Sequence, residues 1–427
     1  MSVSSNIIDE LQWRGLVHQC TDLESVNKEL SDSTRIYAGF DPTSDSLHVG
    51  SLLPLMMLRR FQSAGHRPIA LVGGATGMVG DPSGKSDERV LLSKEALQHN
   101  VSGIEKQMRR FLDFEAPNAA IVVNNYDWMQ SFSFLDFLRD IGKNFPVNVM
   151  LGKDSVKSRL ERQDIGLSFT EFSYMLLQAY DFVYLAQHHG CKIQIGGSDQ
   201  WGNITAGIDL GRRMLGQPLY GVTCPLLTTS DGKKMGKTEK GAVWLSADKT
   251  SPYEFYQYFI NVKDSDVLMT LRFLSDVTNE EYHAIEAGMS QSPGDAQRRL
   301  AESLTNLVHG EAGLKSAVRA SGILFGAEID SYTDKELSSI FADVPSSSVP
   351  RARLADGLSL IDALCTVALA TSKSDARRMI EGGSAYINNR KAESIDRKLT
   401  AEDLASETMI VLRQGKKKYA LLMFEKS

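Results

Sequence analysis

β-type runs and amphipathic helical runs alternate along the first half of this 427-residue chain, and this alternation limits its fold more than any other feature. Strand-like runs are expected at residues 35–40, 68–72, 120–124 and 192–195. Helical patterns separate or follow them at residues 52–64, 94–112, 134–143, 170–188 and 201–214. Strands that alternate with helices of this length pair in a parallel sheet with right-handed crossovers. We therefore predict an α/β fold with a Rossmann-like parallel-sheet domain over residues 1–228.

The second half of the chain has a different organisation. A loop and linker are expected at residues 229–250, and the β-type signal fades after about residue 251, so residues 251–344 are expected to form a helical domain. Residues 345–350 read Pro-Ser-Ser-Ser-Val-Pro, a composition typical of a linker, which we place at residues 345–357. Two helical patterns and three β-type runs then predict a small α+β domain over residues 358–427.

Two short segments carry the strongest functional signal. His48-Val49-Gly50-Ser51 lies where the first strand-like run gives way to a helical run, so it directs an imidazole and backbone N–H groups at one point. Phosphate binds to helix N-termini of this kind. The second segment, Lys234-Met235-Gly236-Lys237-Thr238, is a glycine-containing loop whose lysines can close over negative charge. Together they predict a nucleoside triphosphate site. Two P-loop-like stretches, residues 80–86 and 232–238, are each one residue short between their glycines, so a P-loop is not expected.

Composition and charge indicate which compartment, metal sites and partners to expect. The four cysteines lack the paired spacing of a zinc or redox site, so we expect a reducing compartment and no protein-bound metal. No secretory signal or membrane span is evident, so a cytoplasmic protein is expected. The net charge of −6 argues against nucleic-acid binding by the chain as a whole. Residues 372–418, however, contain eleven Lys and Arg against seven Asp and Glu, and phosphate contact depends on such local basic faces.

A set of motifs resembles, in order and spacing, the bacterial tyrosyl-tRNA synthetases. Besides the two segments above, the set comprises YAGFDPT at residues 37–43, residues 73–81, NNYDW at residues 124–128 and GGSDQWGN at residues 196–203. The segment from Leu358 to about Arg413 resembles the S4-type RNA-binding domain that closes many of those enzymes. The resemblance covers essentially the whole chain. It implies a class I aminoacyl-tRNA synthetase with a Rossmann-like catalytic domain, a helical domain that contacts tRNA and an S4-like domain.

The resemblance implies a two-step reaction. The carboxylate of tyrosine attacks the α-phosphate of ATP, which arrives with Mg²⁺, and the tyrosyl group of the adenylate then passes to the terminal ribose of tRNA(Tyr). Because the substrate supplies the nucleophile, the protein needs positive charge and hydrogen-bond donors around the phosphates. The resemblance assigns the catalytic contacts to Thr43, His48, Lys85, Arg89, Lys234 and Lys237. It assigns further contacts to ATP to Gly39, Asp41, His48, Gly50, Ser51, Gly197, Asp199, Lys237 and Thr238.

The expected amino-acid pocket includes one face of a helix. Tyr174, Gln178 and Asp181 are spaced by four and three residues within a predicted helix, so their side chains share a face. By resemblance the first two bind the ammonium group with Asp81, and Asp181 binds the phenolic hydroxyl with Tyr37. A buried Tyr–Asp pair left without a hydroxyl partner costs free energy, which would reject phenylalanine. The resemblance thus assigns the tyrosine contacts to Tyr37, Asp81, Tyr174, Gln178, Asp181 and Gln200.

The chain departs from the family pattern at two positions near the expected ribose. The signature turn usually ends in His, often replaced by Asn, but here it ends in Ser51. Ala38 stands where some relatives carry a cysteine. Both changes remove or shorten a hydrogen-bonding group, so we expect Ser51 to contact the ribose poorly or through water.

The remaining expectations concern partners and alternatives. Contacts to tRNA are expected from Lys373, Arg377, Arg378, Arg390 and Lys391, and a homodimer is implied by the family alone. A tryptophan-specific relative is disfavoured because an indole has no hydroxyl for Asp181. A small nucleotidyltransferase with a His-x-Gly-x turn would lack the long helical segment and the RNA-type domain. A non-catalytic RNA-binding paralogue is supported only by Ser51.

Overall fold

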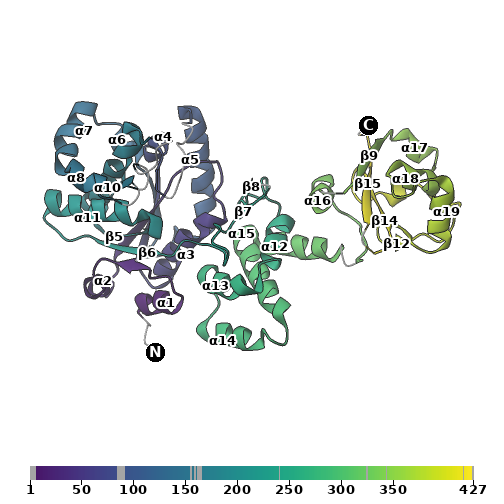
Figure 1. The fold of residues 1–427 in the computed structure, drawn as a ribbon, viewed down its shortest axis with the longest axis horizontal. Coiled ribbons are helices and arrows are strands. Elements are labelled where there is room, and N and C mark those ends of the chain that lie inside the picture. The colour runs from purple at the N-terminus through teal and green to yellow at the C-terminus, as the bar shows by residue number, and fades with distance from the viewer. Residues whose placement is uncertain are drawn as a thin grey trace. The chain divides into compact units, whose positions relative to one another are not determined.

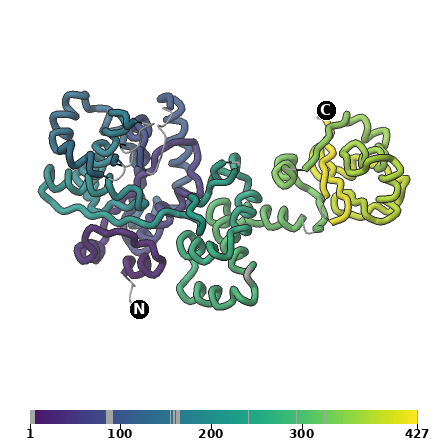
Figure 2. Tube along the Cα trace, viewed as in Figure 1, coloured from purple at the N-terminus to yellow at the C-terminus, as the bar shows by residue number. Residues whose placement is uncertain are grey.

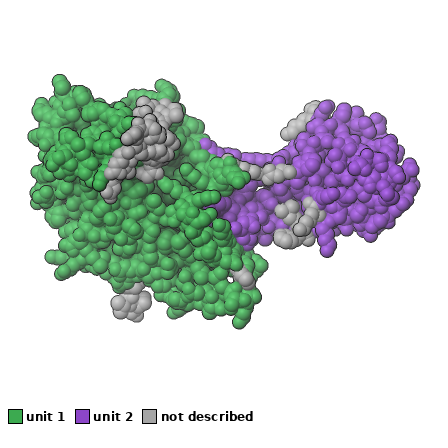
Figure 3. Space-filling model, in the orientation of Figure 1, with its two compact units in different colours: residues 1–246, 262–300 green, residues 247–261, 301–427 purple. Residues whose placement is uncertain are grey.

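The computed structural model describes residues 6–83, 92–153, 156–157, 160, 166–239, 241–323, 326–342, 344–416 and 418–425. Two compact units make up the chain (Figure 3). Unit 1 comprises residues 1–246 and 262–300, and unit 2 comprises residues 247–261 and 301–427. Among the helices of the described residues, none is long and apolar enough to cross a membrane.

Unit 1 is built on a six-stranded sheet with the strand order β1-β6-β5-β2-β3-β4. The five strands from β2 to β6 run parallel, which confirms the predicted parallel sheet, and only β1 pairs in the antiparallel direction, with β6. The strands are β1 Gln19–Cys20, β2 Arg35–Phe40, β3 Arg67–Val72, β4 Ile121–Asn124, β5 Cys191–Gly197 and β6 Tyr220–Cys224.

Helices surround this sheet (Figure 1). α3 and α5 follow β2 and β3, and α10 and α11 precede and follow β5, so right-handed crossovers put the two pairs on opposite faces. The helices that lie wholly in unit 1 and whose bounds the structure describes are α1 Ile7–Trp13, α2 Leu23–Glu29, α3 Val49–Ser63, α4 Thr76–Val79, α5 Lys94–Met108, α6 Tyr126–Met129, α7 Phe134–Asp140, α8 Val147–Leu151, α10 Phe169–His189, α11 Trp201–Leu215, α13 Asp264–Leu274 and α14 Asn279–Gly288.

The chain order reverses between β2 and β5, which are neighbours in the sheet although about 150 residues separate them in sequence. β3, the next strand after β2, pairs with β2 on one side of this boundary. β6, the next strand after β5, pairs with β5 on the other side. A crevice opens at such a reversal, beyond the carboxyl ends of the two strands, and ligands of α/β proteins bind there. This topology therefore determines where a site is expected.

Unit 2 contains a five-stranded sheet with the order β12-β11-β14-β15-β9. Alternate residues of β14 face two different cores. Ile410 and Leu412 pack with α18 (Leu360–Thr366) and α19 (Lys373–Glu381). Met409 and Val411 pack with the end of α15 (Pro293–Ile323) and with α16 (Asp334–Ile340). The sheet is therefore covered on both faces, as the period of two in a strand requires. Its strands are β9 Ser346–Val349, β11 Ala385–Ile387, β12 Arg390–Lys391, β14 Met409–Gln414 and β15 Lys418–Phe424.

The remaining elements are short, with one exception. α15 Pro293–Ile323 begins in unit 1 and continues in unit 2, and its helical geometry is interrupted at Gly310, where φ is 74°. The other elements are α12 Pro252–Ile260, α16 Asp334–Ile340, α17 Ala352–Ala355, α18 Leu360–Thr366, α19 Lys373–Glu381, and the two-residue strands β7 Lys237–Thr238, β8 Gly241–Ala242, β10 Leu358–Ser359 and β13 Lys398–Leu399.

Two parts of the expected domain organisation differ from the structure. The helical segment 251–344 is divided, because residues 262–300 belong to unit 1 and the rest to unit 2. The expected linker contains β9, which pairs in parallel with β15 at the edge of the sheet (Figure 2). Its serines resemble a linker in composition because an edge strand needs few buried side chains, and in β9 only Val349 is buried.

Candidate active site

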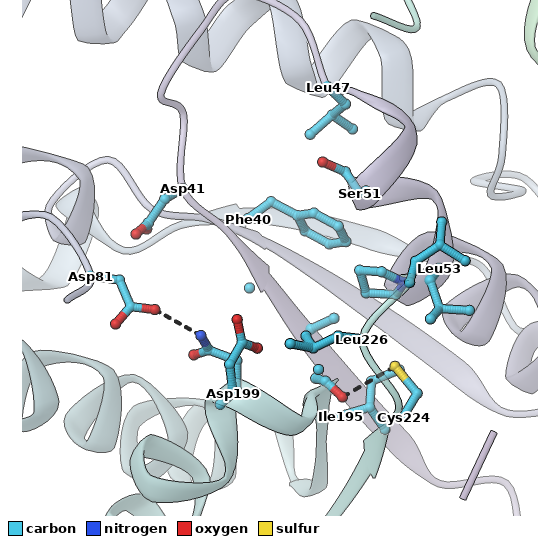
Figure 4. Close-up of a pocket in the computed structure, with 18 of the residues that line it drawn as sticks. Phe40, Asp41, Leu47, Ser51, Leu53, Asp81, Ile195, Asp199, Cys224 and Leu226 are labelled. Carbon is cyan, nitrogen blue, oxygen red and sulfur yellow. Dashed lines mark hydrogen bonds between the residues drawn. The ribbon is translucent and has the colours of Figure 1, made fainter. Parts of the chain in front are cut away.

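A cavity of about 360 Å³ lies beyond the carboxyl ends of β2 and β5, at the reversal of the chain order. Figure 4 shows the carboxylates Asp41, Asp81 and Asp199 on one side of it, with Ser51 and Leu53 of α3 on the other. Sixteen of the predicted residues line the cavity: Tyr37, Gly39, Asp41, Thr43, His48, Gly50, Ser51, Asp81, Tyr174, Gln178, Asp181, Gly197, Asp199, Gln200, Lys234 and Lys237.

Three of the residues predicted to contact tyrosine or ATP are not among the lining residues. Lys85 and Arg89 lie outside the described residues. Thr238 lies in β7, where its hydroxyl donates a hydrogen bond to the carbonyl of Gly241 at 3.1 Å. This hydrogen bond closes a two-stranded turn beside the cavity, so the structure gives Thr238 a local role in the loop.

The deep end of the cavity holds a buried carboxyl. Asp181 is 1% exposed, and its two oxygens accept hydrogen bonds from Asn125 Nδ2 and Trp128 Nε1, both at 3.0 Å. Burial raises the pKa of Asp181 to about 8, although these two hydrogen bonds act in the opposite direction. The Tyr37 hydroxyl is buried nearby and has no hydrogen-bond partner among the described residues. Burial and the charge of Asp181 raise the pKa of Tyr37 well above its usual value, so it stays protonated.

A chain of hydrogen bonds connects Asp181 with Asp41. Asn125 Nδ2 also donates to Thr76 Oγ1 at 3.0 Å, and Thr76 Oγ1 donates to Asp41 Oδ1 at 2.8 Å. The other oxygen of Asp41 accepts from the Tyr174 hydroxyl at 2.8 Å. A side chain at Gly73 would collide with this chain, because its Cβ would lie 2.2 Å from Asp41 Oδ1. The segment after β3 therefore needs glycine where the backbone passes the carboxylate.

Asp81 is the centre of a second polar cluster, on the segment that follows α4. Its Oδ2 accepts from Gln200 Nε2 at 2.7 Å, and its Oδ1 accepts from the backbone N–H of Ser83 at 2.9 Å. Asn203 of α11 donates to Gln200 Oε1 at 3.2 Å, which orients that amide. The carboxylates of Asp81 and Asp41 thus line one side of the cavity and favour a cationic group there.

The His48 turn differs in one respect from the sequence expectation. Its backbone N–H groups were expected to bind phosphate, but the N–H of Val49 donates to the carbonyl of Val243 at 2.9 Å, and that of Ser51 to the carbonyl of His48 at 2.8 Å. The imidazole instead lies over Gly50, whose Cβ, if present, would be 2.8 Å from His48 Cε1. The N–H groups of Val49 and Ser51 are therefore used within the protein, and Gly50 leaves room for the imidazole.

The KMGKT loop, residues 234–238, packs directly against this turn. Gly236 has a φ of 83°, and a Cβ there would lie 2.7 Å from Val49 Cβ, so only glycine fits. Its carbonyl accepts from the N–H of Val243 at 2.8 Å. Lys234 and Lys237 flank this contact, and both are exposed and line the cavity. Burial raises the pKa of Asp199 across the cavity, whereas the positive charge of Lys234 opposes the rise.

The wall opposite the carboxylates is mostly apolar. Leu53, Leu226 and Cys224 lie there (Figure 4), and Pro54 of α3 also lines the cavity. The Cys224 thiol donates to the carbonyl of Gly196 at 3.4 Å. Burial raises the pKa of Cys224 to about 12, so this thiol stays neutral and part of the apolar wall. Within the described residues no three His, Cys, Asp or Glu side chains are grouped as metal ligands.

The sequence analysis assigned no role to several residues that organise the site. Asn125 and Trp128 belong to the NNYDW motif, so the motif was visible although its contact with Asp181 was not. Thr76 lies in the segment 73–81 and Asn203 ends the GGSDQWGN motif, so both positions were visible in the sequence although their contacts with Asp41 and Gln200 were not. Gln194 lines the cavity and is 2% exposed, and its Oε1 has no partner in the described part of the chain.

Comparison with known proteins agrees with this geometry. Residues 28–326 match the family described as tRNA synthetases class I (W and Y), and residues 336–422 match the tyrosine–tRNA ligase SYY-like C-terminal domain. The tyrosine–tRNA ligase of Rhodopirellula baltica is 59% identical over 428 residues, which cover 99% of this chain and 98% of the relative. That of Staphylococcus haemolyticus is 48% identical over 99% of this chain and 100% of the relative.

Solved structures place the chain in the same fold. A C-terminally truncated mitochondrial tyrosyl-tRNA synthetase of Aspergillus nidulans aligns with a TM-score of 0.67 and 32% identity, over 75% of this chain and 94% of that one. A tryptophanyl-tRNA synthetase of Encephalitozoon cuniculi, at 14% identity, shares the fold with a TM-score of 0.54, over 78% of this chain and 90% of that one. The chain therefore belongs to the class I tRNA synthetases of the W and Y family and, within it, to the bacterial-type tyrosyl-tRNA synthetases.

Proposed function

We propose that the cavity of unit 1 activates L-tyrosine with ATP and that the protein then transfers the tyrosyl group to the terminal ribose of tRNA(Tyr). The observation that supports this assignment most is the deep end of the cavity. Asp181 and Tyr37 are both buried there, and the Tyr37 hydroxyl has no partner among the described residues. An unsatisfied buried hydroxyl costs free energy, which a phenolic oxygen of a substrate would recover.

The amino group of tyrosine fits the acidic side of the cavity. Asp81 is held by Gln200 and Ser83, so its charge is fixed near the position that an ammonium group would take. Tyr174 and Gln178 line the same region, on the face of α10 that also carries Asp181. A tyrosine with its ammonium group at Asp81 and its hydroxyl at Asp181 would direct its carboxylate toward the His48 turn.

ATP fits the remaining space. The apolar wall of Leu53, Pro54 and Leu226 would suit an adenine ring, and Ser51 and Asp199, which line the same cavity, would meet the ribose. Thr43, His48, Lys234 and Lys237 would then contact the phosphates, with Lys85 and Arg89 proposed as further contacts. Mg²⁺ would arrive with ATP as part of the substrate, because Mg²⁺ is usually held by phosphate oxygens and water.

The chemistry needs no nucleophile from the protein. A tyrosine carboxylate oxygen attacks the α-phosphorus of ATP, the bond to the bridging oxygen breaks, and pyrophosphate leaves with the negative charge that develops. Cationic side chains that meet this charge only as it develops lower the barrier. A ribose hydroxyl of tRNA then attacks the carbonyl carbon of the adenylate, which forms the ester and releases AMP.

We assign tRNA contact in part to the basic side chains of unit 2. Three of the five predicted cations have acidic partners, because Lys373 pairs with Asp362, Arg378 with Asp375 and Arg390 with Glu328. Arg377 and Lys391 have no ion pair within the described residues and are exposed. Lys391 lies over Gly383, just after α19, the helix that carries Arg377. These two cations are therefore the most available for phosphate.

Reversing both charges, in Arg377→Glu/Lys391→Glu, is expected to lower kcat/KM for tRNA charging about tenfold or more, because each lost phosphate contact weakens binding and its salt dependence. Tyrosine-dependent pyrophosphate exchange should not change, since neither residue lines the cavity. Arg353→Glu, an exposed charge on α17, serves as the control. Unchanged charging by the double variant at several salt concentrations would refute this assignment.

A homodimer is proposed through an apolar face of unit 1. Phe134 and Leu135 of α7 are 65% and 74% exposed, and Val147 of α8 and Phe169 of α10 are 59% and 65% exposed. α7, α8 and α10 lie at the same end of unit 1 (Figure 1). Exposed apolar side chains that gather on one surface mark an interface more often than a solvated face.

Leu135→Asp is expected to convert a particle of twice the 47.1 kDa chain mass into one of 47.1 kDa in sedimentation analysis, because burying the carboxylate in the interface is costly. Val318→Asp in α15 provides the control. This valine is 43% exposed, but it is distant from α7 and α8 in the sequence and belongs to unit 2. A Leu135→Asp protein that keeps the doubled mass would show that dimerisation uses another surface.

Pyrophosphate exchange with each amino acid in turn tests the proposed activity itself. A signal with tyrosine alone supports it, a signal with tryptophan would support the tryptophan-specific alternative, and silence with all amino acids would leave a non-catalytic RNA-binding role. The cytoplasm is the proposed compartment, and the four free cysteines agree with its reducing conditions.

A further inference from the structure

One end of α13 is held by two buried arginines from distant parts of the chain. Arg14, which follows α1, donates to the carbonyls of Arg272 at 2.9 Å, Ser275 at 3.3 Å and Val277 at 2.8 Å. Arg60, in the last turn of α3, donates to the carbonyl of Ser275 at 2.9 Å. Carbonyls at the end of a helix lack helical partners and carry partial negative charge, so guanidinium groups satisfy them well. We call Arg14 and Arg60 the arginine clasp.

The other end of α13 holds the KMGKT loop and the segment before it. Asp266 is 2% exposed, and its Oδ1 accepts from the backbone N–H of Ser230 at 2.9 Å. The Thr270 hydroxyl donates to the carbonyl of Asp266 at 2.8 Å and lies 3.6 Å from the sulfur of Met235, which is itself 4% exposed. Met235 lies next to Lys234 and two residues before Lys237. The backbone that carries both lysines is therefore attached to α13.

The same loop is attached on its other side to the start of α3, through Gly236 and through the hydrogen bond from Val49 to Val243. α3 thus begins at the His48 turn, beside the loop, and carries Arg60 in its last turn, beside the far end of α13. α3 therefore contacts both α13 and the loop, and α13 contacts the loop as well. All of these residues belong to unit 1.

The arginine clasp contributes little to the stability of the fold for the number of charged groups that it buries. Glu10 is the only carboxylate that pairs with it in the described residues, at 3.0 Å from Arg14 Nε and 3.9 Å from Arg60 Nε. Arg60 Nε and Nη1 have no hydrogen-bond partner there, and burial and the charge of Arg14 lower the pKa of Arg60 to about 9. Apolar side chains of similar volume would hold a helix end at lower cost. Directional hydrogen bonds, in contrast, fix its position.

We propose that Arg14 and Arg60 are positioning residues for adenylate formation: by fixing the end of α13 against α3, they hold Lys234 and Lys237 over the triphosphate. This inference rests on the proposed function of the same cavity. Neither arginine lines the cavity, so their effect would be transmitted through Asp266, Thr270 and the loop. Tyrosine binding, at the other end of the cavity, should not depend on them.

A double-mutant cycle tests the inference. Arg14→Met keeps the volume of the side chain but removes its donors, and is expected to slow single-turnover adenylate formation about tenfold without changing tyrosine affinity more than about twofold. In a Lys234→Ala/Lys237→Ala background the same change should cost less than about twofold, because both residues that the clasp positions are already absent. Equal costs in both backgrounds would show that the clasp acts on stability alone and would overturn the inference.

Arg59→Met is the matched control. Arg59 precedes Arg60 on α3 and pairs with Asp276 at 3.3 Å in the segment after α13, but its side chain is 34% exposed and that of Asp276 58%. Such an exposed ion pair contributes little, so this variant should behave like the wild type. Arg14→Lys keeps the charge but cannot bridge three carbonyls, and it should give a smaller loss than Arg14→Met.

A second readout does not depend on activity. In the ligand-free protein, amide hydrogen exchange of residues 228–239 should be about tenfold faster in Arg14→Met than in the wild type, while β2 and β5 stay unchanged. Equal exchange in the loop would overturn the inference even in a protein that activates tyrosine. A wild type that forms no tyrosyl-adenylate would overturn the proposed function instead, and the exchange result would still report whether the clasp holds the loop.

Discussion

Replacing Lys237 by alanine is expected to slow the formation of tyrosyl-adenylate by about 100- to 1,000-fold, because removing one preorganised donor to developing charge has an effect of this size. Lys237 lines the cavity and its side chain is exposed at the mouth, where pyrophosphate would leave. The charge that Lys237 is proposed to meet would develop only in the transition state, so the dissociation constant of tyrosine should stay within about twofold of the wild-type value. Single-turnover kinetics and equilibrium binding measure the two quantities separately.

The loop offers its own control for this experiment. Lys233 is also exposed and lies in the same segment, but it does not line the cavity. Its carbonyl accepts the N–H of Thr229 at 2.8 Å, and this backbone contact survives substitution of the side chain. Lys233→Ala should therefore form adenylate at the wild-type rate. If Lys233→Ala and Lys237→Ala were equally slow, net charge in the loop would matter instead of the placement of one lysine.

Asp181→Asn is expected to lower kcat/KM for tyrosine by about 10- to 100-fold, in line with the loss of a hydrogen bond to a charged group. The substitution keeps the size of the side chain but puts an amide where Asn125 and Trp128 both donate. One of these donors, or the phenolic hydroxyl, then loses its acceptor. Because phenylalanine has no hydroxyl to lose, its much weaker activation should change less, so that discrimination between the two substrates decreases. Equal losses for tyrosine and phenylalanine would contradict phenol recognition by Asp181.

The raised pKa of Asp181 also predicts a pH dependence. With a pKa of about 8 in the folded protein, the carboxyl is mostly protonated at lower pH, and a phenol that donates to it must displace that proton. Tyrosine affinity should therefore rise with pH toward 8, by at most about tenfold per pH unit, and level off above it. Calorimetry between pH 6 and 8.5 measures this slope, which should disappear in Asp181→Asn.

The raised pKa of Asp181 also determines how the stability of the folded protein changes with pH. The unfolded chain releases the proton of Asp181 near pH 4, about its ordinary pKa, whereas the folded protein keeps this proton up to about pH 8. Since the folded state binds more protons in this window, the contribution of Asp181 to stability is fully present below pH 4 and is lost as the pH rises toward 8. Asp181→Asn should remove this part of the pH dependence of the unfolding free energy.

The sequence was most informative where a pattern is local. Alternating strands and helices predicted the parallel sheet, and the spacing of Tyr174 and Asp181 on one helix predicted a shared face, which α10 presents to the cavity. These predictions depend on backbone periodicity, which neighbouring residues determine. The motifs at the strand ends also fall on the cavity, because the carboxyl ends of parallel strands meet at one edge.

The features that the sequence did not predict depend on contacts between distant segments. The N–H groups of the His48 turn were expected to be available for phosphate, but a segment almost 200 residues away uses that of Val49. β9 was expected to be a linker because its pairing with β15, over 70 residues later, leaves no trace in its composition. The roles of Asn125 and Thr76 likewise exist only through side chains that the fold brings together. Such contacts between distant segments do not follow from local propensity.

A crystal structure of the protein with a non-hydrolysable tyrosyl-adenylate analogue tests the central claim most directly. Two buried groups at one end of the cavity and two lysines at the other should bracket the ligand. The account predicts a phenolic oxygen within hydrogen-bond distance of both the Asp181 carboxylate and the Tyr37 hydroxyl, with the phosphate mimic on the side of His48 and the KMGKT loop. An analogue bound outside this cavity, or with its phenol away from Asp181, would contradict it.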